Sequence, residues 1–257
     1  MTDLQKASLG KRIIAFIFDG MLLATLAVGL AVFFSFCFGY DAQLERYENV
    51  RVQYEQRYEI DSQIHPDTYQ GTSEEDKAAY QERWTQANAA LRQDTEYINL
   101  YSRIQSIQLM ILTFSPLAAI LVMELFFPLL IGNGQTLGKK IFGIGIMSIE
   151  STRITGKQVF IRAVLGKYTI ELMLPIYIAI MVLNGILNGT VGLFLLAALL
   201  IAQIVCIVIT RTNAPIHDVF AATVAVDLAS QRIFEDIEDR DNYIKARHAE
   251  LAARADY

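Results

Sequence analysis

The chain has 257 residues, of which 53% are hydrophobic and 19% are charged, and its formal net charge at pH 7 is −5. Because the apolar residues gather in several long runs, a single soluble core is excluded and a polytopic membrane protein is indicated. The negative charge argues against nucleic acid as a partner. The two cysteines, Cys37 and Cys206, both lie in apolar runs, so the sequence indicates no disulfide and assigns no metal site.

The first apolar run follows a short polar leader and covers residues 11–40. It is long enough to cross a bilayer, and no small-residue cleavage site follows it. Residues 1–40 are therefore predicted to form a cytoplasmic leader and an uncleaved first transmembrane helix. Asp19 lies inside this run, seven residues or about two helical turns after Arg12. A carboxylate at membrane depth needs a partner, and Arg12 is the nearest local candidate.

The next segment, residues 41–103, is polar and contains 13 acidic residues against 7 basic ones. This charge bias predicts an extracytoplasmic position. Aromatic and apolar residues recur at spacings of three and four in residues 40–58 and again in residues 80–101, which predicts a helical hairpin. A capping box formed by Thr72 and Glu75 is expected to start its second helix. The aromatic residues could form the seam between the two helices or a surface for a partner.

Residues 104–131 are predicted to form the second transmembrane helix, which contains one acid, Glu124. If this helix returns to the cytoplasmic side, Glu124 lies about 12 Å from its inner end. Asp19 and Glu124 then share the inner half of the membrane. Two such carboxylates could form an ion or proton site, because neighbouring acids shift each other's protonation, or each could be a structural contact between helices.

The loop at residues 132–167 contains six basic residues and one acidic residue, which predicts a cytoplasmic position. Lys139 and Lys140 are expected to meet lipid phosphates or the inner carboxylates. Within the loop, residues 144–149 have the pattern of a strand. Residues 159–165 have the pattern of a short interfacial helix.

Residues 168–209 are predicted to contain the third and fourth transmembrane helices, and residues 210–257 a polar motif followed by a charged helical tail. Residues 223–226 could be a strand beside residues 144–149 or the start of the tail helix. The predicted fold is thus an all-α integral membrane protein with four transmembrane helices and both termini cytoplasmic. An extracytoplasmic helical hairpin lies between helices 1 and 2, and a small cytoplasmic β element completes the fold.

Three motifs flank the polar insert in order: Arg12 with Asp19, the stretch GQTLGKKIFGI at residues 134–144, and His217-Asp218 followed by Ala222-Thr223. Together they resemble the RDD family of bacterial membrane proteins, named for one arginine and two aspartates, which here match Arg12, Asp19 and Asp218. The resemblance does not extend to residues 41–103, and Asn213-Ala214-Pro215 stands where a glutamine-containing run is expected. It implies a multi-pass protein of the bacterial inner membrane.

Charged groups from both ends of the membrane core are expected to converge in a cytoplasmic-facing polar site. Its predicted members are the motif residues Arg12, Asp19 and Asp218, supported by Glu124, Lys139, Lys140 and His217. One alternative is a salt-bridge lock in which Arg12 holds both Asp19 and Asp218. His217 could act as a pH-sensitive gate or make a plain hydrogen bond at the membrane surface.

Two classes of function are compatible with this pattern. The first is a transporter, for which the family resemblance implies monovalent cations exchanged against protons, with Asp19 and Glu124 as carriers. Four spans are few for alternating access, so a homo-oligomer is expected. The second is a non-catalytic scaffold or adaptor whose hairpin binds a membrane or envelope protein. No nucleophile, base and orienting acid occur together in the pattern, so neither an enzyme nor a cofactor is predicted.

Overall fold

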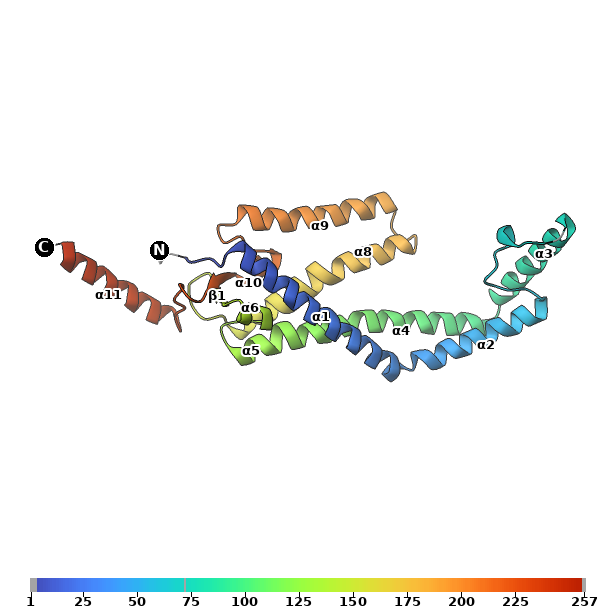
Figure 1. The fold of residues 1–257 in the computed structure, drawn as a ribbon, viewed down its shortest axis with the longest axis horizontal. Coiled ribbons are helices and arrows are strands. Elements are labelled where there is room, and N and C mark those ends of the chain that lie inside the picture. Colours follow the sequence, from blue (N-terminus) through green and yellow to red (C-terminus); the bar gives the residue numbers. More distant parts are fainter. Residues whose placement is uncertain (1–3, 72, 256–257) are drawn as a thin grey trace. The chain divides into compact units, whose positions relative to one another are not determined.

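The computed structural model describes residues 4–71 and 73–255, and Figure 1 shows their helices and strands. Four of the described helices are long and apolar enough to cross a membrane: Leu9–Phe38, Thr95–Ile131, Gly156–Leu183 and Gly189–Ile209. A two-stranded sheet is also present. The predicted number of membrane helices and the β element are confirmed. The chain forms two compact units, Met1–Val28 with Pro116–Tyr257 and Gly29–Ser115, and each unit has its own apolar cluster.

The unit Gly29–Ser115 includes α2 (Tyr40–Tyr58), a 3-10 turn at Pro66–Thr68 and α3 (Glu74–Leu91). Gly39, with a φ of 66°, separates α2 from α1 (Leu9–Phe38), because this left-handed conformation costs glycine little. The cap of α3 is Ser73, whose hydroxyl accepts a hydrogen bond from the Asp76 N–H at 3.1 Å. Thr72 of the predicted capping box lies outside the described residues.

The apolar cluster of this unit involves α2, α3 and the start of α4 (Thr95–Ile120). Buried Val50, Leu91 and Leu100 form its centre, and Tyr47, Tyr54 and Tyr97 pack against them. The hydroxyls of Tyr47 and Tyr97 are hydrogen-bonded at 2.7 Å, and their rings are stacked 4.9 Å apart. These contacts support seam packing as the role of the aromatic residues.

The helix predicted across residues 80–101 is interrupted. Asp94 lies between α3 and α4, and its carboxylate accepts hydrogen bonds from the Tyr97 N–H at 3.0 Å and the Tyr54 hydroxyl at 2.8 Å. Asp94 therefore caps a new helix, as short polar side chains do, although its spacing fits the apolar series. These hydrogen bonds also hold the pKa of Asp94 below its usual range.

The second membrane helix is a continuous helical run, Thr95–Ile131, that begins before the predicted residue 104 because Asp94 caps it. It consists of α4, a π-helical segment η2 (Leu121–Phe126) and α5 (Phe127–Ile131). The π-helical segment contains buried Glu124. Such wide turns often occur where a helix carries functional side chains.

The third membrane helix, Gly156–Leu183, consists of α7 (Gly156–Phe160), a long π-helical segment η3 (Ile161–Met173) and α8 (Leu174–Leu183). A capping box of Thr155 and Gln158 starts it. The separate interfacial helix predicted at residues 159–165 is therefore wrong, because these residues are the first turns of the membrane helix. The fourth membrane helix is α9 (Gly189–Ile209), which begins after the cap residue Asn188.

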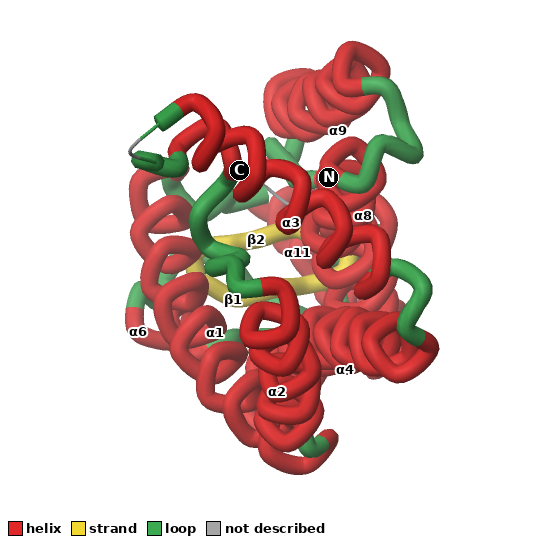
Figure 2. The backbone as a smooth tube through the Cα atoms, turned by 90° about the vertical axis from the view of Figure 1, so that its right-hand side faces the viewer, coloured by secondary structure: helices red, strands yellow, loops and turns green. Residues whose placement is uncertain are grey.

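The sheet pairs β1 (Ile144–Ser148) with β2 (Thr223–Asp227) in antiparallel register, with Ile144 opposite Asp227 and Ser148 opposite Thr223. Figure 2 shows the two strands side by side. Short helices precede both strands, α6 (Leu137–Ile141) before β1 and α10 (Ile216–Ala221) before β2. Residues 223–226 are thus strand, which settles the alternative that the sequence leaves open. Most strand side chains are buried.

The charged tail is helical only from Ile237 onward, as α11 (Ile237–Ala255). The residues before α11 lie beside the segment that follows β1. Phe234 is 1% exposed, and its carbonyl accepts a hydrogen bond from the Arg153 N–H at 2.8 Å. Burial of this aromatic ring anchors the start of the tail to the unit that contains the sheet.

Gly166 of η3 permits a close approach to α10. A Cβ atom at this position would lie 2.6 Å from the Cα of His217 and closer still to its Cβ. We expect Gly166→Ala to lower the unfolding free energy by about 1–3 kcal/mol, because the backbone of one helix must shift. Thermal unfolding in detergent micelles measures this loss. The control is Gly156→Ala, whose Cβ would meet only Leu129 at 3.8 Å; an equal loss in both variants would contradict the prediction.

Candidate functional site

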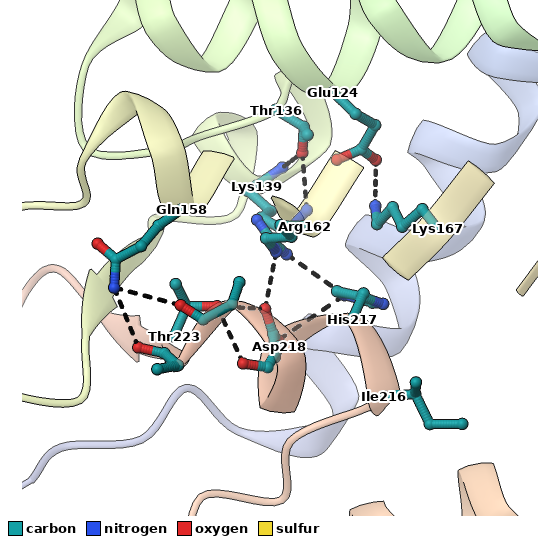
Figure 3. A network of polar contacts seen from close by, with 12 residues as sticks. Glu124, Thr136, Lys139, Gln158, Arg162, Lys167, Ile216, His217, Asp218 and Thr223 are labelled. Atoms are coloured by element: carbon teal, nitrogen blue, oxygen red, sulfur yellow. Dashed lines mark hydrogen bonds and ion pairs between the residues drawn. The ribbon is translucent and has the colours of Figure 1, made fainter. Parts of the chain in front are cut away.

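Nine titratable side chains form a charged cluster in the unit Met1–Val28 with Pro116–Tyr257. Four are acids and four are bases, and the ninth is a histidine. Figure 3 shows the ion pair of Glu124 with Lys167 and the contacts of Arg162 with His217 and Asp218. The charged cluster is defined as Arg12, Asp19, Glu124, Lys139, Arg162, Lys167, Glu171, His217 and Asp218. Since the two charge types are equal in number, most of the charges neutralise one another inside the protein.

Asp19 of α1 binds the start of α6. Its carboxylate accepts hydrogen bonds from the Thr136 hydroxyl at 2.5 Å and from the Gly138 N–H at 2.7 Å, and the Lys139 ammonium is 3.8 Å away. A Cβ on Gly138 would lie 2.7 Å from the Ala15 carbonyl oxygen, so only glycine allows this approach of α6 to α1. The expected pairing of Asp19 with Arg12 is therefore wrong.

Arg12 binds backbone rather than a carboxylate. Its guanidinium donates to the carbonyl of Asn213 at 2.9 Å and to that of Thr212 at 3.4 Å. These carbonyls lie in the turn between α9 and α10, where Asn213 has a φ of 50°. The prediction of a salt-bridge lock between Arg12 and the two acids Asp19 and Asp218 is therefore wrong, because Arg12 pairs with neither acid. Arg12 does link α1 to the segment before α10, through backbone oxygens.

Asp218 of α10 pairs with Arg162 of η3. Arg162 lies within residues 132–167, which were predicted to form a cytoplasmic loop. The Arg162 Nε lies 2.7 Å from the Asp218 Oδ1, and the Thr223 hydroxyl donates to the same oxygen at 2.8 Å. The two side chains are only 5% and 2% exposed. Burial alone would raise the pKa of Asp218, but Arg162 and His217 hold it well below its usual range. This buried ion pair is the closest match to the predicted lock.

His217 is buried between two acids instead of lying at a surface. Its Nδ1 is 2.9 Å from the Glu171 Oε1, and its Nε2 faces the Arg162 Nη2 at 3.5 Å and the Asp218 Oδ2 at 3.8 Å. Burial lowers the pKa of His217, outweighing the opposite effect of Asp218 and Glu171. A neutral imidazole that donates Nδ1–H to Glu171 fits this geometry. Gln203 of α9 also donates to Glu171, at 3.3 Å.

Glu124 of η2 forms an ion pair with Lys167 of η3. Asp19 and Glu124 thus each have a cationic neighbour of their own, and the structure does not pair the two acids with each other. Lys139 lies near both: burial lowers its pKa to about 7, although Glu124 and Asp19 oppose this shift. The Lys139 ammonium also lies 3.1 Å from the Thr136 hydroxyl. Lys140 is exposed and is not part of the charged cluster.

Much of the charged cluster faces a cavity of about 580 Å³. Its walls come from α1, η3, α9 and α10, and its size falls within the range of about 300–1,000 Å³ that ligand pockets occupy. The charged groups lie among side chains of leucine, isoleucine and phenylalanine. Among the described residues no group of three or more histidine, cysteine or acidic side chains could hold a metal ion. The size of the cavity and its mixture of charged and apolar side chains suit an organic ligand.

A family model described as RDD family matches residues 6–222. The chain belongs to the RDD family. RDD proteins are membrane proteins, and with four candidate spans this one is a multi-pass membrane protein. No curated protein and no solved structure matches the chain. The match includes the insert, which the motifs of the sequence did not cover, and it ends before β2.

In this RDD protein the three motif residues have three separate partners. Arg12 binds backbone carbonyls, Asp19 binds the start of α6, and Asp218 binds Arg162. Three members of the charged cluster were not predicted from the sequence: Arg162, Lys167 and Glu171. One signal for them was available: charges at positions 162, 167 and 171 share the apolar stretch that becomes η3.

Loss of one partner of the buried pair should be costly. We expect Arg162→Gln to lower the unfolding free energy by about 3–5 kcal/mol, because Asp218 is left charged and buried. Arg153→Gln is the control, since Arg153 pairs with Glu235 at 2.9 Å on the surface, where an ion pair contributes at most about 1 kcal/mol. Chemical unfolding in micelles compares the two. Equal losses of unfolding free energy would show that the buried ion pair contributes no more to stability than the surface pair.

Lys139 should make stability depend on pH. Its pKa is about 7 in the folded protein and about 10.5 normally, so between these values the unfolded chain binds the extra proton and stability rises with pH. The rise attributable to this group is at most about 1.4 kcal/mol per pH unit. Thermal unfolding from pH 6 to 10 should show it in wild type and in Lys140→Gln, whereas Lys139→Gln lacks it. An unchanged slope in Lys139→Gln would contradict the assignment.

Proposed function

We propose that this RDD protein is a membrane transporter in which protonation of the charged cluster is coupled to the passage of a ligand through the cavity. The observation that carries the proposal is the cavity of about 580 Å³, which is lined by every member of the charged cluster except Glu124. Intramembrane charges are costly, and they are characteristic of substrate and proton pathways. Purely structural contacts would not need a cavity of this size beside them.

The proton-binding role fits Lys139 and His217 better than the acids expected from the sequence. Asp19 and Glu124 are already bound by close donors of their own. Burial lowers the pKa of both Lys139, to about 7, and His217. Because Lys139 changes charge near neutral pH, a single proton alters the net charge of the cavity wall.

The orientation of the protein is part of the proposal. The basic residues between α5 and α7, together with the positive-inside rule, support a cytoplasmic position for α6, β1 and both termini. The acidic segment at residues 41–103 would then lie outside, in a bacterial inner membrane. A homo-oligomer would supply the additional helices that alternating access uses. No enzymatic activity is proposed.

Proton movement is tested with the purified full chain in liposomes that contain a pH-sensitive dye. We expect an outward gradient of Na⁺ or K⁺, or of an organic anion, to change the internal pH, because coupled transport moves protons with the ligand. Lys139→Gln should reduce the initial rate at least about tenfold, while exposed Lys140→Gln should not. Wild-type liposomes that behave like protein-free ones, for all three gradients, would exclude transport.

A scaffold is the second candidate, and the separate unit Gly29–Ser115 favours it. This unit has an aromatic cluster of its own and contributes no member to the charged cluster. If it binds an envelope protein, replacement of residues 41–103 by a short linker should abolish co-purification of that partner. The charged-cluster variant Lys139→Gln should retain it. A deletion that leaves every co-purifying protein in place would contradict the scaffold role.

A further inference from the structure

The charged side chains that line the cavity are not balanced, although the charged cluster as a whole is. Four cations reach the lining, but Glu124, which neutralises Lys167, does not. The lining acids are Asp19, Glu171 and Asp218. With His217 neutral, the formal excess in the lining is one positive charge, that of Lys167, and Glu124 neutralises it without lining the cavity itself. The capacity to bind an anion must therefore come from cations that have no close carboxylate partner.

Two of these cations are only partly neutralised. Among the described residues Arg12 has no carboxylate within 4.0 Å, since its hydrogen bonds go to carbonyl oxygens. Lys139 is 3.8 Å from Asp19, beyond hydrogen-bonding distance, and Asp19 is already bound by Thr136 and Gly138. Arg12 and Lys139 are therefore the groups with binding capacity left for an anionic head.

The remaining wall of the cavity is apolar. Ile13 and Phe16 of α1 and Leu196, Leu199 and Leu200 of α9 contribute to it. Phe16 is 67% exposed and Leu200 is 63% exposed, so the protein itself leaves much of these side chains uncovered. An alkyl chain placed between α1 and α9 would cover part of this apolar surface.

We propose that the cavity binds an amphiphilic anion, with a carboxylate or phosphate head beside Arg12 and Lys139 and an alkyl tail between α1 and α9. This rests on the proposed function, because it names the class of ligand that the same cavity takes. A guanidinium and an ammonium together bind such a head strongly, since hydrogen bonds to charged groups are stronger than neutral ones. A free single-chain amphiphile and a phospholipid share this chemistry.

The test is a titration of the full chain, released from maltoside micelles, with dodecyl phosphate, followed by native mass spectrometry. Inorganic phosphate supplies the head alone and dodecanol the tail alone. We expect dodecyl phosphate to bind one per chain, at least about tenfold more tightly than either fragment. Equal binding of dodecanol would overturn the proposal, because the cations would then contribute nothing.

Variants separate the head from the tail. Arg12→Gln should weaken dodecyl phosphate binding about tenfold, and Arg12→Lys, which keeps the charge, should restore part of it. Leu199→Trp fills the apolar wall without changing a charge and should also weaken binding. Its control is Leu193→Trp, since Leu193 is 70% exposed and does not line the cavity. Similar affinities for the two tryptophan variants would overturn the placement of the tail.

The source of the amphiphile and the role in transport have separate readouts. Displacement of dodecyl phosphate by phosphatidylglycerol, and not by phosphatidylcholine, would identify a phospholipid; resistance to both would identify a single-chain anion, and either result supports the proposal.

Binding of dodecyl phosphate without any flux in liposomes would overturn the transport proposal and leave the proposal of an amphiphilic anion standing. Proton-coupled flux of Na⁺ or K⁺ without binding of dodecyl phosphate would overturn this one alone.

Discussion

The ion pair of Arg162 and Asp218 is the interaction on which the rest of the site depends. Both side chains are almost completely buried, so each charge must be neutralised inside the protein. This requirement brings α10 against η3, where Gly166 leaves room for the backbone of His217. It also fixes the start of β2, because the Thr223 hydroxyl shares the Asp218 carboxylate. One buried pair thus couples a membrane helix, a short helix and the sheet.

Asp19 imposes a second constraint of the same kind at the other wall of the cavity. Its carboxylate is stabilised mainly by hydrogen bonds from the Thr136 hydroxyl and the Gly138 N–H, whereas the Lys139 ammonium lies farther away, at 3.8 Å. A short helix start can stabilise a carboxylate because its first N–H groups have no partner inside the helix. Lys139 therefore has no acid within hydrogen-bonding distance, burial lowers its pKa to about 7, and its side chain remains available to the cavity.

Much of the fold could be predicted from the sequence, because four apolar runs, the periodic insert and the strand pattern at residues 144–149 are local signals. The errors arose where a polar residue belongs to a helix. Asp94 fits the apolar spacing of its segment yet caps α4. Arg162 and Lys167 were counted as loop charges, since the charge bias that orients loops does not distinguish a buried arginine from an exposed one. The site residues Asp19, Asp218, Glu124, Lys139 and His217 were found, but their partners depend on tertiary contacts between distant segments.

The balance of the charged cluster explains why a proton and an anion would influence each other here. With four acids and four bases, loss of the Lys139 proton leaves a net negative charge in a region of low dielectric constant, where its effect on a nearby charge is large. An anionic head beside Arg12 and Lys139 would raise the pKa of Lys139 and favour its protonated form. By linkage, protonation of Lys139 must favour the anion by the same free energy. The charge arrangement would thus itself couple proton binding to anion binding, which is what the proposed transport requires, whichever side of the membrane the cavity opens to.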